Sequence, residues 1–169
     1  VALPILSHYF DVNFQIIQWL ITAYLFAVCL MIPIAGRLSD VFSSRQTYLF
    51  GIAVFIIGSF LCSIATQIHE FIFFRVIQGI GASFLLANTQ AILMHTFPKA
   101  LRGRALGINS MIVACGAIVG PSLGGFLIQF LGWRSIFYIN IPIGLLGYLG
   151  TFIYLKQDEK TTKEQIDFS

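Results

Sequence analysis

Five long apolar blocks, separated by short polar segments, set the pattern of the chain. Each block is near the length of about 20 residues that a helix needs to cross a bilayer, because an α-helix rises about 1.5 Å per residue. The apolar residues fill each block, whereas a half-buried strand would alternate and a surface helix would show one stripe. The pattern therefore predicts five membrane-spanning helices. They cover residues 16–36, 47–66, 71–95, 105–131 and 135–155.

The two ends of the chain differ from these blocks. Residues 1–7 are apolar but too few to span a bilayer, and we interpret them as the end of an earlier helix. Residues 156–169 are abruptly polar and predict a linker. We expect an all-α membrane bundle over residues 1–155, with five full transmembrane helices and the end of a first. A secretory signal peptide would give a single short apolar block, so it is excluded.

Composition supports a membrane protein over a soluble domain. Hydrophobic residues make up 57% of the chain and charged residues 10%, whereas a soluble domain carries about 25% charged residues. Cys29, Cys62 and Cys115 lie in three different blocks, which fits neither a zinc site nor a disulfide framework. We find no nucleophile–base set and no phosphate-binding loop. We therefore expect no enzyme activity, no metal or cofactor, and no nucleic-acid partner.

The basic residues indicate how the chain is oriented. Eight of the ten lysines and arginines fall in alternate polar segments, 37–47, 96–104 and 156–169, while the other connections hold almost none. Short loops on the cytoplasmic side of a membrane carry an excess of Lys and Arg. We therefore predict a multi-pass protein of the cell membrane with these three segments in the cytoplasm.

The polar segment after the first block holds charges of both signs within a tight turn. Gly36 and Leu38 precede Asp40, and Arg45 follows. A carboxylate such as Asp40 is favourable near a helix N-terminus. Two interpretations stay open: these are ordinary solvated charges, or they form a contact that exists in one conformation and breaks in another.

Polar side chains inside the blocks are candidates for a transport cavity. Arg75 is costly within a span, and such a charge usually faces a cavity or a partner. Gln78 lies on the same helical face, one turn away. Gln18 and Thr22 share a face of the first block, and Asn109 lies in the fourth. The alternatives are an Arg75 side chain that reaches the interface, and polar packing between helices for the others.

Glycine is concentrated in the fourth block, around one proline. Gly116, Gly120 and Gly124 recur every four residues, so they leave one helical face without side chains and permit close helix contact. Pro121 removes a backbone hydrogen bond and is expected to bend the helix. The alternative is generic packing of small residues. The full set is Gly107, Gly116, Gly120, Pro121, Gly124 and Gly125.

These stretches resemble the conserved motifs of the major facilitator superfamily. Residues 36–45 are similar to its motif A, G-x-L-x-D-x-x-G-R-[RK], with Ser43 at the position of the second glycine. Arg75, Gln78 and Gly79 match motif B, R-x-x-Q-G, and the glycines of the fourth block match motif C, which marks proton-coupled exporters. Residues 18–25 and 133–144 resemble the fourteen-span drug:proton antiporter subfamily of the EmrB/QacA type.

The resemblance implies the N-terminal helical bundle of such a transporter. It implies proton-coupled export of small hydrophobic or amphipathic compounds by alternating access, with Arg75 tuning a protonation site. The expected partners are the lipid bilayer, protons, the small-molecule substrate and a missing C-terminal half. A uniporter or symporter of a small metabolite on the same fold, or a truncated fragment that does not transport, are the alternatives.

Overall fold

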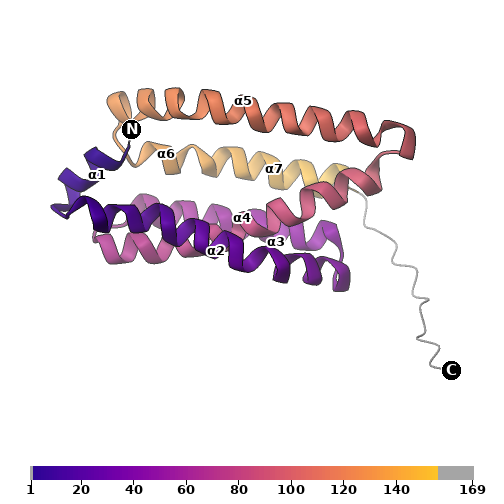
Figure 1. Ribbon diagram of the computed structural model, residues 1–169, viewed down its shortest axis with the longest axis horizontal. Helices are drawn as coiled ribbons and strands as arrows, with labels where there is room; N and C mark the ends of the chain where they lie inside the picture. The colour runs from indigo at the N-terminus through magenta and orange to yellow at the C-terminus, as the bar shows by residue number, and fades with distance from the viewer. Residues whose placement is uncertain (1, 156–169) are drawn as a thin grey trace.

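The computed structural model describes residues 2–155, and the prediction of an all-α fold is confirmed. Every regular element within this range is an α-helix (Figure 1). Four single helices and the continuous stretch Ser135–Tyr154 are long and apolar enough to cross a membrane. The predicted linker at 156–169 lies outside the described residues. The helices are α1 Ala2–Phe10, α2 Phe14–Val41, α3 Ser44–Ile64, α4 Ile68–Thr96, α5 Lys99–Leu131, α6 Ser135–Tyr138 and α7 Asn140–Tyr154.

The connection between α2 and α3 is much shorter than the loop that the sequence suggested. α2 continues through Gly36, Leu38 and Asp40 to Val41, and α3 begins at Ser44. Residues 37–41 contain no proline and no glycine, so α2 can extend beyond its apolar block. The turn itself depends on Ser43, whose φ of 149° lies in the region that favours glycine.

Proline sets two further boundaries. Pro98 is the N-cap of α5, so this helix starts at Lys99, before its apolar block begins. Pro142 has no N–H to donate to the carbonyl of Tyr138 four residues earlier, which accounts for the break between α6 and α7 at Ile139. By contrast, α5 runs unbroken through Pro121.

Helix α4 lies between α2 and α3 and packs closely against both, while α6 and α7 pack on α3 (Figure 1). Glycines allow the α3–α4 contact. A Cβ atom added at Gly58 would lie 2.6 Å from Cα of Gln78, and one added at Gly51 would lie 2.6 Å from Cβ of Phe84. Since carbon atoms in contact are about 3.5–4.0 Å apart, only glycine permits these two helices to approach so closely.

Helix α5 makes few contacts with the rest of the described chain. Its buried residues are Ala105, near the start, and Ile128, near the end. Between them the helix runs apart from the α2–α3–α4 layer (Figure 1). The share of buried residues in its apolar window is 6%, against 39% in α3 and α4. Most of this helix is therefore available to lipid or to other protein segments.

Aromatic side chains form a buried cluster at the end of the bundle where α1 meets α2. The ring of Trp133 lies 5.3 Å from that of Phe71 and 5.6 Å from that of Phe10. Arg134 stacks on Trp133 and donates to the carbonyls of Ser63 and Ala65, at 2.9 and 3.1 Å. The segments between α1 and α2, α3 and α4, and α5 and α6 thus meet at one end.

Candidate transport site

Arg75, on α4, lies at the centre of a polar network that joins several helices. Its Nε donates to the carbonyl oxygen of Leu20 on α2, at 3.3 Å. Its guanidinium carbon lies 4.4 Å from the ring centroid of Tyr24 on α2 and 5.9 Å from that of Phe137 on α6. The cation therefore contacts a backbone carbonyl and two aromatic faces, which stabilise positive charge in a partly dehydrated site.

Gln78 extends this network from Arg75 into α3. An Arg75 terminal nitrogen donates to Oε1 of Gln78 at 2.6 Å, and Nε2 of Gln78 donates to Oγ of Ser59 at 2.7 Å. Nδ2 of Asn140, the first residue of α7, also donates to Ser59, at 3.5 Å. Gln78 is 2% exposed and Ser59 is fully buried. The four side chains thus form a chain from α4 through α3 to α7.

Close packing of α2 on α4 brings Tyr24 beneath the arginine. A Cβ added at Gly79 would lie 2.7 Å from the carbonyl oxygen of Tyr24. Glycine at this position therefore allows the two helices to approach one turn away from Arg75. This is a packing role for a residue that the sequence singled out through the R-x-x-Q-G pattern alone.

The other predicted cavity residues are not joined to this network. Gln18 and Thr22 are exposed on α2, and the hydroxyl of Thr22 donates to the carbonyl of Gln18 within the same helix, at 3.1 Å. Asn109 lies on α5, where it lines a separate pocket. The α2 residues that do contact Arg75 are Leu20 and Tyr24. The predicted set is therefore distributed over at least two places.

The residues near the α2–α3 turn lie at the opposite end of the bundle from Trp133. Gly36 has no atom within 4 Å of an added Cβ, and Leu38 lines a small pocket of about 300 Å³. Asp40 is exposed. Arg45 donates to the carbonyl oxygen of Phe152 near the end of α7, at 2.8 Å, and stacks over the Phe152 ring. Arg45 therefore connects α3 to α7.

Four glycines of α5 have open space beside them in the described part of the chain. An added Cβ at Gly107, Gly116, Gly120 or Gly124 would meet no described atom within 4 Å. Pro121 is exposed and Gly125 is half-buried. Within residues 2–155, close backbone approach therefore occurs at the α3–α4 and α2–α4 seams, and the α5 face stays uncovered.

Sequence reasoning missed Tyr24, Ser59 and Asn140 as members of the site. A single serine in an apolar block carries little signal, because small residues are common at all helix contacts in membranes. Tyr24 and Asn140 fall inside the two stretches that resemble the EmrB/QacA-type subfamily. Their places in these two stretches were the one signal in the sequence that pointed to them as site residues.

The fold and this network define a multi-pass integral membrane protein with a cation held between its helices. Comparison with known proteins names the family: the sequence profile of the Major Facilitator Superfamily matches residues 1–169, and the chain belongs to this family of membrane transporters.

Several curated relatives carry transporter names. The riboflavin transporter RibZ of Clostridioides difficile (strain 630) is 39% identical over 151 residues, which cover 89% of this chain and 33% of the relative. Multidrug resistance protein 3 of Bacillus subtilis (strain 168) is 36% identical over 156 residues, 92% of this chain and 30% of the relative. Multidrug resistance protein Stp of Mycobacterium tuberculosis (strain CDC 1551 / Oshkosh) is 35% identical over 170 residues, 100% of this chain and 32% of the relative. The chain thus spans about a third of the length of these relatives.

Proposed function

We propose that the chain forms part of the N-terminal half of a proton-coupled exporter of small hydrophobic or amphipathic compounds, of the fourteen-span EmrB/QacA type, in the plasma membrane. The observation that carries the proposal is the Arg75 network. It holds a cation between α2, α4 and α6 and connects it by hydrogen bonds to α3 and α7. A charge within a span, fixed by partners on several helices, is suited to a coupling site.

The chemistry of this cation suits control of a proton. Among residues 2–155, the groups that contact Arg75 include no carboxylate. A carboxyl group of the complete transporter that approached Arg75 would be favoured in its deprotonated form, because a nearby positive charge stabilises the anion. Arg75 would thus help the carboxyl group to release its proton, and loss of the contact would let the group bind a proton again.

The direction of transport rests on two indications. Two of the relatives above are named multidrug resistance proteins, and the glycines of α5 match the motif of proton-coupled exporters. The riboflavin transporter shows that a relative of similar identity is named for a metabolite. For this chain we propose export, with the α5 glycine face turned toward the remainder of the transporter. The basic segments at the α2–α3 and α4–α5 ends would lie in the cytoplasm.

Transport in everted membrane vesicles that carry the full gene product tests the proposal. Addition of a transported compound to energised vesicles should release protons, detected with a pH-sensitive dye. We expect Arg75→Ala to abolish this release while substrate–substrate exchange, which needs no net proton movement, continues. Arg75→Lys keeps the charge and should retain part of the coupling.

Each result separates a coupling role from other roles. Proton release at the wild-type rate in Arg75→Ala would refute coupling through this residue. Substrate-driven proton entry in place of release would show a symporter. Loss of exchange and coupling together, with normal membrane insertion, would show that Arg75 serves substrate binding.

A further inference from the structure

A separate pocket lies at the junction of α4 and α5, away from the Arg75 network. Its volume is about 380 Å³. Leu93 near the end of α4 and Phe97 just after it form one wall, and Leu101, Ile108 and Ile112 from α5 continue it along the helix. The pocket is therefore an elongated apolar hollow that follows the axis of a membrane-spanning helix.

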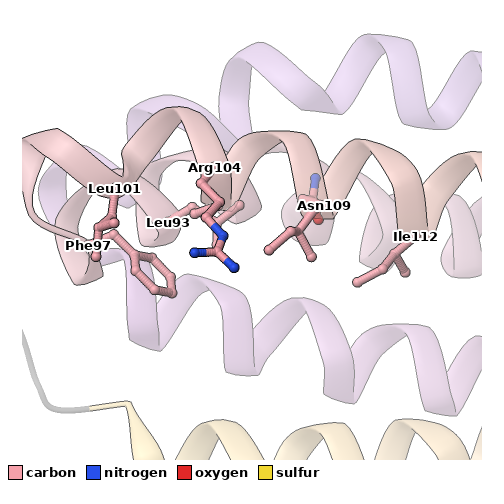
Figure 2. A pocket seen from close by; sticks show the side chains of 8 residues that line it. Leu93, Phe97, Leu101, Arg104, Asn109 and Ile112 are labelled. Atoms are coloured by element: carbon pink, nitrogen blue, oxygen red, sulfur yellow. The ribbon is translucent and has the colours of Figure 1, made fainter.

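One charged side chain lies in this apolar setting. Figure 2 shows Arg104 and Phe97 directed to the same side of the chain, with Ile112 further along α5. No hydrogen bond or ion pair within residues 2–155 engages the guanidinium of Arg104. Arg102, two residues away, differs, since its Nε donates to the carbonyl of Phe97 at 3.2 Å. Arg104 is thus the cation of this pocket whose hydrogen-bonding capacity is unused in the described chain.

The order of groups along α5 matches the order of groups in a phospholipid. Arg104 lies toward the end of the bundle that carries Lys99 and Arg102, and the apolar Ile108 and Ile112 lie toward the middle of α5. Asn109 is about 7.5 Å further along the helix axis than Arg104, at 1.5 Å per residue. A phosphate near Arg104 would place ester groups near the Asn109 amide and an acyl chain along the apolar wall.

We propose that this pocket binds an anionic phospholipid of the inner leaflet, with its phosphate at Arg104. Arginine binds phosphate oxygens with paired donors, and basic pockets between membrane helices on the cytoplasmic side hold acidic lipid head groups. Lys99 and Arg102 add positive charge beside the pocket. The inference rests on the proposed membrane orientation and is independent of proton coupling or export.

Native mass spectrometry of the full gene product, released from nanodiscs, tests the inference. The discs contain phosphatidylglycerol and phosphatidylcholine in equal amounts, and retained lipids are counted. We expect retained phosphatidylglycerol in excess over phosphatidylcholine. Arg104→Gln should weaken phosphatidylglycerol binding by at least about ten-fold, because it removes paired charge-assisted hydrogen bonds to the phosphate. Lys99→Gln removes the same charge outside the pocket and should weaken binding by no more than about five-fold, the contribution of one basic side chain near an anionic surface.

A second variant separates the pocket from surface charge. Ile112→Phe keeps every charge but narrows the apolar wall, and we expect it to reduce lipid retention as well. Equal losses in Arg104→Gln and Lys99→Gln would show diffuse electrostatics and overturn the site. An adventitious lipid, retained equally in all variants, would also overturn it. Unchanged lipid retention with altered export of anionic compounds in Arg104→Gln would assign the pocket to cargo. Arg104→Lys serves as the folding control, because it retains the positive charge.

Discussion

Replacement of Ser43 by glycine should stabilise the protein, although it removes a side chain that forms a hydrogen bond. Ser43 has φ 149° and ψ 149°, a combination that is essentially restricted to glycine and costs other residues about 1–3 kcal/mol. Its hydroxyl partly offsets this strain by accepting from the backbone N–H of Gln46 at 3.3 Å, as the N-cap of α3. Ser43 also occupies a glycine position in the motif that the sequence resembles.

The expected magnitude follows from three terms. Relief of strain contributes about 2 kcal/mol. Glycine lowers this by about 0.5–1 kcal/mol through the added freedom of the unfolded chain, and loss of the cap to glycine costs a few tenths. Ser43→Gly should therefore raise the free energy of unfolding by about 1 kcal/mol. Ser43→Ala is the matched control: it retains the strain and loses the cap, so it should lower this free energy by about 1 kcal/mol.

Equilibrium unfolding in mixed detergent micelles, followed by circular dichroism, measures both variants. We expect changes of opposite sign from two substitutions that each remove the same hydroxyl. If Ser43→Gly destabilises the protein as much as Ser43→Ala, the hydroxyl dominates and the strain at this turn is negligible. If both variants match the wild type, neither the strain nor the cap contributes.

Two further predictions concern the α3–α4 seam. Gly58→Ala should lower the free energy of unfolding by about 1–3 kcal/mol, because its Cβ would lie 2.6 Å from Cα of Gln78 and force the helices apart. The control is Gly147→Ala, whose Cβ would meet no described atom within 4 Å. Equal stability of the two variants would contradict the close contact. Ser59→Ala should cost about 1 kcal/mol, because it leaves the buried Gln78 amide without its partner. The control is Ser63→Ala, because Ser63 is equally buried on the same helix and its hydroxyl donates to the carbonyl of Phe60 in that helix. Both variants are measured by the same unfolding assay. A larger loss of stability in Ser63→Ala than in Ser59→Ala would refute the interhelical role of Ser59.

The spans themselves could be predicted from sequence because the bilayer imposes a length and an apolar composition on every helix that crosses it. Helix ends could not, since polar residues beyond the apolar blocks still satisfy their backbone groups best within the helix. α2 therefore reaches Val41 and α5 starts at Lys99. Hydropathy identifies residues that prefer lipid to water, and it carries no information on where a polar interfacial turn begins.

The Arg75 site was only partly predictable, for a related reason. Arg75 and Gln78 stood out because polar groups are rare within spans. Their partners Ser59 and Tyr24 depend on how α2, α3 and α4 are rotated about their axes, which a single sequence does not specify. Gln18 and Thr22 show the converse, since both are polar and share a face but lie exposed on α2.

Two arginines at opposite ends of the bundle indicate which helices form a rigid unit. Arg134 donates to the carbonyls of Ser63 and Ala65 at the end of α3, and Arg45 donates to that of Phe152 near the end of α7. Carbonyls at helix C-termini lack intrahelical partners and carry partial negative charge, so a guanidinium stabilises them. Each arginine therefore connects α3 to the α6–α7 segment, one at each end, while the glycine seam holds α3 to α4. Within residues 2–155 no arginine ties α5 to α3, and near its C-terminus α5 accepts one bond, from the Ser135 hydroxyl to the carbonyl of Leu127 at 3.2 Å. We therefore expect relative motion within this part of the transporter to occur at α5 first.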